Sequence, residues 1–153
     1  KLFHSDGVLL KELENESNLL SAVVTDPPYV LHAEKYTTDE RDISSFDHEK
    51  YMEAIKQNFQ QLHRLIKPSN FDEKVFHPVI FKVGTGRRGT MGIVDMDADF
   101  QQVAKECGFV LWDKLYNHLA SPWAAVNWER NYKNKYVQKN YETNLVFVKF
   151  GKS

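Results

Sequence analysis

The residues best suited to chemistry lie in one short segment, Asp26-Pro27-Pro28-Tyr29. An amine attached to an aromatic base is a poor nucleophile because its lone pair is delocalised into the ring. A carboxylate and a proline-flanked backbone carbonyl can each accept one N–H of such an amine, which localises the lone pair as the transition state forms. The prolines hold these acceptors in place, and Tyr29 can stack on a base extruded from a duplex. The segment therefore suits attack by an exocyclic amine on an electrophilic methyl group.

The same residue types are common in turns, so a plain turn is the alternative for this segment. The preceding run, residues 19–25 (LLSAVVT), favours the site over the turn. It is nearly all apolar or small, with β-branched residues, which is typical of a strand buried on both faces of a parallel sheet. Open α/β sheets bind ligands at the carboxyl ends of their strands, which is where Asp26 would lie.

The other expected elements alternate between helix and strand. Apolar stripes at three-four spacing predict helices, and shorter apolar runs predict strands. The expected helices cover residues 8–13, 47–67 and about 100–107, with Pro68 and Gly108 at the ends of the last two. The expected strands cover residues 78–83, 109–116 and 145–150, the last of these at or near a sheet edge or in a hairpin. This order predicts one α/β domain over residues 1–153.

Composition excludes several classes of protein. With 42% apolar and 27% charged residues, the chain is neither disordered nor collagen-like. No apolar run approaches the roughly 20 residues of a membrane span, and the first residues carry no signal pattern. The single cysteine, Cys107, excludes an internal disulfide and fits a reducing, cytoplasmic location. A net charge of −1 argues against a generally basic nucleic-acid binder but leaves room for local basic patches.

The sequence resembles the amino-methyltransferases that modify adenine N6 or cytosine N4 in DNA. Residues 23–29 (VVTDPPY) match the catalytic motif of that family closely. Weaker matches lie on both sides of this motif, in the order expected for the family, and together they cover most of the chain. They are residues 4–13, 62–68, 78–83, 106–109, 112–114 and 141–149. The resemblance implies a Rossmann-like, S-adenosylmethionine-dependent methyltransferase sheet with flanking helices.

The resemblance also implies roles for individual residues, with S-adenosylmethionine as cofactor and a flipped base of DNA as substrate. Asp26 and the carbonyl of Pro27 would hold the target amine, Pro28 would shape the loop and Tyr29 would stack on the base. Asp6 falls where the family has an acidic contact to the adenine of the cofactor, so the cofactor site would include Asp6 and Asp26. Asp, rather than Ser, at position 26 favours adenine N6 over cytosine N4.

The sequence departs from the family pattern at three places. Ser5 precedes Asp6 where the family has glycine, and Ser69-Asn70 follows Pro68 where the family has Gly-Gly. No Phe-x-Gly-x-Gly loop, the family's signature for the methionine end of the cofactor, occurs in the chain. Residues 84–86 (GTG) do not replace this loop, because they follow a different strand from the one that precedes the loop in the family. Because the chain also begins at Lys1 without an initiator Met, we expect it to hold the catalytic part of an incomplete fold.

Two basic segments suit contact with nucleic acid. Arg87 and Arg88 lie in a Gly-rich loop, and Arg130 and Lys133 lie among the aromatic residues of segment 117–140. Cations interleaved with aromatic rings contact phosphates and bases in nucleic-acid-binding proteins. An ordinary solvated surface explains both segments about equally well.

No metal site is expected, because the histidines are scattered without ligand spacing. Asp95, Asp97 and Asp99 alternate but lack the glycine and the distal glutamate of a calcium loop, so one of them is expected to cap a helix. Cys107 lies on an apolar stripe and is predicted to be a buried packing residue.

Two other functions stay open at this point. A related methyltransferase could act on an amine or amide of RNA or protein, and a non-catalytic nucleic-acid-binding domain could keep the fold without the cofactor. The sequence leaves the oligomeric state open, and a restriction-system partner is compatible with the resemblance.

Overall fold

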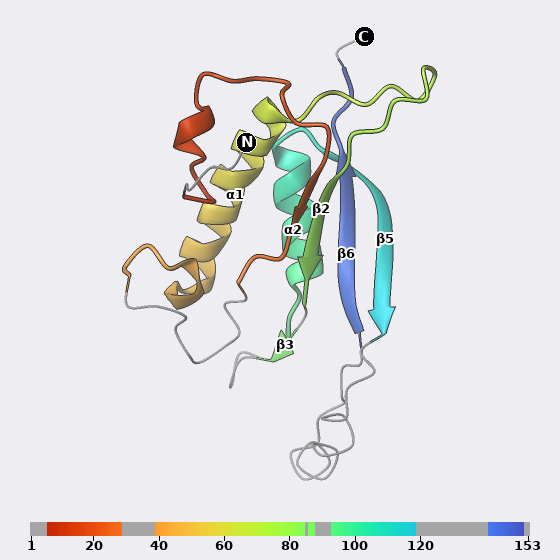
Figure 1. The fold of residues 1–153 in the computed structure, drawn as a ribbon. Helices are drawn as coiled ribbons and strands as arrows, with labels where there is room; N and C mark the ends of the chain where they lie inside the picture. Colours follow the sequence, from red (N-terminus) through yellow and green to blue (C-terminus); the bar gives the residue numbers. More distant parts are fainter. Residues whose placement is uncertain (1–5, 29–38, 85, 88–92, 119–140, 152–153) are drawn as a thin grey trace.

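The computed structural model describes residues 6–28, 39–84, 86–87, 93–118 and 141–151 (Figure 1). Their main sheet has four strands in the order β1-β2-β6-β5. These strands are Val23–Thr25 (β1), Val79–Val83 (β2), Tyr141–Val148 (β6) and Val110–His118 (β5). β1 runs parallel to β2, whereas β6 runs antiparallel to both β2 and β5. A small second sheet pairs Gly86–Arg87 (β3) with Ile93–Val94 (β4). The expected α/β class is confirmed.

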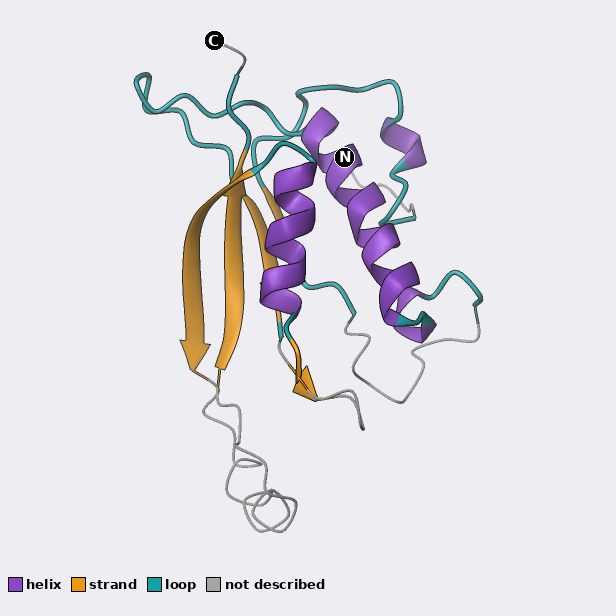
Figure 2. Ribbon diagram, turned by 180° about the vertical axis from the view of Figure 1, so that it is seen from behind, coloured by secondary structure: helices purple, strands orange, loops and turns teal. Residues whose placement is uncertain are grey.

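The helices α1 (His48–Leu65) and α2 (Met96–Glu106) lie on the same face of the main sheet (Figures 1 and 2). Within the described ranges no helix covers the opposite face. α1 begins after Asp47, whose side chain accepts a hydrogen bond from the backbone N–H of Lys50 at 2.8 Å. Asp95 caps α2 in the same way, so the predicted Asp cap is confirmed. The predicted helix end at Gly108 is confirmed too, because its φ is 87°.

The core between the helices and the sheet is centred on Phe59 of α1. Its ring centroid lies 4.6 Å from that of Phe81 in β2 and 5.4 Å from that of Phe147 in β6. Phe100 and Phe109 complete the cluster at 6.1 and 5.7 Å. All five residues are at most 3% exposed. This packing fixes α1 against β2, the strand that lies beside the predicted catalytic segment.

The predicted strand over residues 19–25 is shorter and more exposed than expected. Only Val23–Thr25 forms β1, and Leu20 makes a separate bridge to Ile66. Val24 is 78% exposed, so burial on both faces is wrong. The physical reason is that, among the described strands, β1 pairs with β2 alone, and its outward side chains lie on the face that the described helices leave open.

Among the described strands, β6 lies next to the edge strand β5 and pairs with it antiparallel, so the expectation of a strand near a sheet edge or in a hairpin is confirmed. Two other predictions need correction. The helix expected over residues 8–13 is a single 3-10 turn, Lys11–Leu13 (η1), preceded by Leu10 at a φ of 47°. Part of the Gly-rich loop forms β3. A second 3-10 turn, Ile43–Ser45 (η2), precedes α1.

Candidate active site

The predicted catalytic segment begins where β1 ends. Thr25, the last residue of β1, pairs with Phe81 of β2, so Asp26 leaves the sheet beside Lys82. Pro27 is buried and Pro28 is half-buried, whereas the Asp26 side chain is 54% exposed. A rigid, partly buried backbone thus carries an accessible carboxylate at the carboxyl end of a strand, as predicted. Tyr29 lies outside the described residues.

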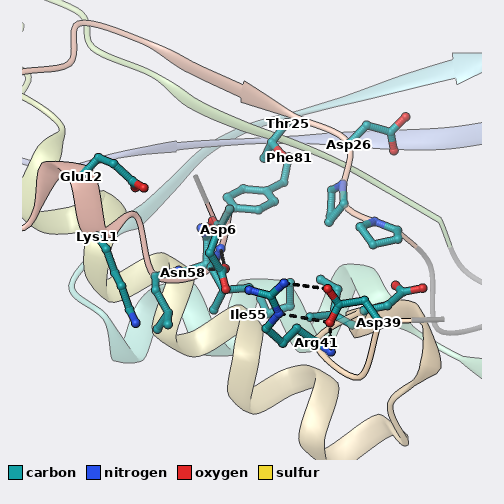
Figure 3. A pocket seen from close by; sticks show the side chains of 17 residues that line it. Asp6, Lys11, Glu12, Thr25, Asp26, Asp39, Arg41, Ile55, Asn58 and Phe81 are labelled. Atoms are coloured by element: carbon teal, nitrogen blue, oxygen red, sulfur yellow. Dashed lines mark hydrogen bonds and ion pairs between the residues drawn. The ribbon is translucent and has the colours of Figure 1, made fainter. Parts of the chain in front are cut away.

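A pocket of about 770 Å³ lies beside this segment, on the side of the sheet that carries α1. It joins segments that are far apart in the sequence. Its lining includes Asp6, residues 25–28, Asp39, Arg41, Ile55, Asn58 and Phe81 (Figure 3). The two acidic residues predicted for the cofactor site, Asp6 and Asp26, therefore border one cavity. In Figure 3 the carboxylate of Asp26 points away from the side chains of Asp6 and Arg41. Pro27 and Pro28 line the pocket with it.

Asp6 also organises the backbone at the pocket wall. Its Oδ1 accepts hydrogen bonds from the backbone N–H groups of Val8 at 2.8 Å and Leu9 at 3.3 Å. Asn58 of α1 donates a hydrogen bond from its side chain to the carbonyl of Gly7, which fixes the same turn to the helix. The pocket therefore has a carboxylate held in a defined place by a short turn.

An ion pair that the sequence analysis missed also lines the pocket. Arg41 donates from Nε to Oδ1 of Asp39 at 3.1 Å and from Nη2 to Oδ2 at 2.7 Å. These hydrogen bonds from Arg41 lower the pKa of the Asp39 carboxyl to about 2 and raise the pKa of Arg41. The only sequence signal was an acid and a base two residues apart, in a segment without periodicity.

Lys82 of β2 is a second missed residue. Its Nζ lies 3.1 Å from Oδ2 of Asp26 and 3.0 Å from Oε2 of Glu142 in β6. The hydrogen bond to Glu142, and then that to Asp26, raise the pKa of Lys82. A lysine inside an otherwise apolar strand was the available signal, but its partners depend on the strand register.

Tyr51 of α1 is the third missed residue. It is fully buried, and its hydroxyl has no hydrogen-bond partner among the described residues. Burial raises the pKa of Tyr51, and the negative charge of Asp26 raises it further. The phenol therefore stays neutral near the catalytic segment.

The remaining predicted residues are placed as follows. The backbone of Arg87 lies in β3, while Arg88, Arg130 and Lys133 lie outside the described residues. Cys107 is half-buried rather than fully buried, and burial raises the pKa of its thiol.

In the part of the chain that the structure describes, no group of three or more His, Cys, Asp or Glu side chains could hold a metal ion. No helix in that part has the length and apolar character needed to cross a membrane.

Comparison with solved structures identifies the fold. TTHA0409 from Thermus thermophilus, named as a DNA modification methylase, has a TM-score of 0.62 at 19% identity, and the match covers 93% of this chain and 50% of that one. The chain has the fold of DNA methyltransferases. The PvuII DNA methyltransferase, described as cytosine-N4-specific, also has a TM-score of 0.62, at 16% identity, with 86% of this chain and 43% of that chain covered.

A third structure is the complex of M1.HpyAVI with SAM, which has a TM-score of 0.54 at 19% identity, over 96% of this chain and 53% of that one. TTHA0409 has also been solved with S-adenosyl-L-methionine. The chain thus spans about half the length of the structures it matches. No protein-family model and no curated protein matches the sequence.

Proposed function

We propose that the chain is the catalytic part of a methyltransferase that transfers a methyl group from S-adenosylmethionine to an exocyclic amine of a flipped DNA base. The observation that carries the proposal is the position of Asp26-Pro27-Pro28 at the carboxyl end of β1, on the rim of a pocket that also contains Asp6. The likeness of the fold to DNA methyltransferases, two of them solved with the cofactor, supports it.

The pocket fits the adenosine part of the proposed cofactor. Its volume of about 770 Å³ lies within the range of about 300–1,000 Å³ typical of small-molecule sites. Leu9 and Ile43 line the pocket and supply accessible apolar surface for an aromatic ring, and Asp6 supplies an acceptor for the N–H groups of adenine. When bound, S-adenosylmethionine supplies an electrophilic methyl group on a positively charged sulfur.

The residues of the chain activate and orient the amine. The Asp26 carboxylate and the Pro27 carbonyl each accept one N–H, so that the nitrogen lone pair points at the methyl carbon. With the methyl group supplied by bound S-adenosylmethionine, the amine would form one N–C bond as the methyl carbon leaves sulfur, and Asp26 or water would accept the proton that the amine loses. Pro28 keeps the loop rigid, and Tyr29 stacks on the extruded base.

Asp at position 26 favours adenine N6 as the target, although one similar structure is cytosine-N4-specific. The DNA backbone would be held by Arg87, Arg88, Arg130 and Lys133, because arginine and lysine neutralise phosphates. These contacts with DNA are proposed from the residue types and their positions in the sequence.

A labelled-methyl assay on DNA, RNA and protein tests the proposal. We expect label in DNA adenine, and Asp26→Ala should abolish transfer while the protein stays folded. Asp72→Ala, which removes an exposed carboxylate from the loop between α1 and β2, is the matched control and should retain full activity.

Three other outcomes would contradict the proposal. Label confined to RNA or protein would show the wrong substrate class. Calorimetry without detectable heat on addition of S-adenosylmethionine, together with no transfer, would favour a non-catalytic domain. Activity retained in Asp26→Ala would remove Asp26 from the mechanism.

A further inference from the structure

Lys82 joins two carboxylates across three adjacent chain segments. Its Nζ lies 3.1 Å from Asp26, which follows β1, and 3.0 Å from Glu142 in β6. The register explains the arrangement. Thr25 pairs with Phe81, so Asp26 follows beside Lys82. On the other side Lys82 pairs with Asn144, and Glu142 lies two residues away along β6, as a diagonal neighbour on the same face.

The three side chains share the sheet face that the described helices do not cover. Phe81 and Thr143 are buried on the helix side, and side chains alternate along a strand. Lys82 and Glu142 therefore lie on the other face, where Asp26 joins them. Their side chains are 35%, 21% and 54% exposed for Lys82, Glu142 and Asp26. Figure 3 agrees, because the Asp26 carboxylate points away from the pocket side chains.

The contact leaves half of the Asp26 carboxylate available. Lys82 binds Oδ2, and within the described residues Oδ1 accepts no hydrogen bond. A carboxylate has about four lone-pair sites on its two oxygens. Oδ1 can therefore accept an N–H from an amine while Oδ2 stays anchored.

We infer that Lys82 is a positioning residue for methyl transfer, held by Glu142 and in turn holding Asp26 Oδ2 so that Oδ1 meets the target amine. The inference rests on the proposed function and deepens it. A surface ion pair alone would contribute little to stability. The ion pair between Lys82 and Asp26 instead fixes the rotamer of the Asp26 carboxylate. A small misplacement of that carboxylate would strongly affect the rate of methyl transfer.

The test compares Lys82→Met with Lys82→Arg in the methyl-transfer assay. Methionine keeps the length of the chain without a charge, whereas arginine keeps a donor. We expect Lys82→Met to lower kcat about 10- to 100-fold, with KM for S-adenosylmethionine within about twofold of wild type, since loss of an interaction that matters mainly in the transition state leaves ground-state binding unchanged. Lys82→Arg should restore much of kcat, and Glu142→Gln should give a smaller loss. Lys105→Met, at an exposed lysine of α2, is the control and should leave kcat unchanged.

The outcomes separate this inference from the proposed function. An active wild type with an unaffected Lys82→Met overturns the positioning role alone. Equal losses in Lys82→Met and Lys82→Arg, or a rise in KM without a fall in kcat, also overturn it. A wild type that methylates no substrate overturns the proposed function, and the positioning role with it.

A measurement without turnover tests the bridge itself. NMR titration of the Lys82 side chain, labelled with ¹³C, reports the pKa of its ammonium. Glu142→Gln and Asp26→Asn should each lower that pKa, because each removes a negative partner. An unchanged pKa in both variants overturns the bridge.

Discussion

The hydroxyl of Thr143 in β6 donates a hydrogen bond to Asp97 in α2, with Oγ1 2.8 Å from Oδ2. Thr143 is fully buried and Asp97 is 8% exposed. Nζ of Lys114 in β5 lies 3.9 Å from the same oxygen, and Oδ1 of Asp97 has no hydrogen-bond partner within the described segments. This small polar cluster ties α2 to the sheet beside Glu142, the residue that holds Lys82.

Thr143→Val should lower the free energy of unfolding by about 1–3 kcal/mol, because the shape is kept while a buried carboxylate loses its donor. Urea unfolding monitored by circular dichroism measures the change. Ser17→Ala, an exposed hydroxyl, should change the free energy by less than about 0.5 kcal/mol. Equal stability of Thr143→Val and wild type would mean that this hydrogen bond does not stabilise the fold.

Gly108→Ala should destabilise the protein by about 1–2 kcal/mol, because φ at this position lies in the left-handed region that an L side chain disfavours. Gly108 has a φ of 87°, and an added Cβ would lie 3.1 Å from Nε2 of His63. Gly7→Ala is the matched control, since nothing lies within 4 Å of the Cβ added there. If the thermal midpoint of Gly108→Ala is no lower than that of Gly7→Ala, an alanine at position 108 causes no backbone strain.

Local signals predicted both long helices and the four main strands, and they placed Asp26 at the end of a strand. Capping aspartates, a terminal glycine and three-four spacing each act within a few residues, so α1 and α2 follow from the sequence. Their bounds differ by a few residues from those predicted, because α1 ends at Leu65 and α2 begins at Met96. The role proposed for Asp26 rests on its residue type and on the strand before it, both of which are local features of the sequence.

The ion pairs around Asp26 depend on pairing between distant segments and were not predicted. Lys82 meets Glu142 only because β6 runs antiparallel beside β2, a register that no local pattern specifies. The Arg41–Asp39 pair reaches the pocket through a segment without periodicity. The exposure of Val24 follows from its place on the sheet face that the described helices leave open, which apolar composition does not reveal.

The stability of the protein should fall as the pH is lowered through about 6.5, the ordinary pKa of histidine. Burial lowers the pKa of His63 in the folded state, and the nearby Lys149 lowers it further. In this window the unfolded chain binds more protons at His63 than the folded chain does, so acid favours unfolding. The stability that neutral His63 contributes is fully present above that pH.

Urea unfolding at several values between about pH 7.5 and 5.5 measures this dependence. His63→Asn should flatten the slope, because it removes the titrating ring that packs against Phe109. His118→Asn, at an exposed position in β5, should keep the wild-type slope. If His63→Asn retains that slope, another group is responsible.

Asp6→Asn should weaken the affinity for S-adenosylmethionine about tenfold, the equivalent of about 1.4 kcal/mol. The amide keeps an Oδ1 that can accept from the N–H of Val8, so the turn is preserved while the charged acceptor facing the pocket is lost. Calorimetry gives the dissociation constant, and the thermal midpoint should stay within a few degrees of wild type. Asp72→Asn, at an exposed aspartate that does not line the pocket, should bind like wild type. An unchanged dissociation constant in Asp6→Asn would exclude Asp6 from the cofactor site and leave the turn as its role.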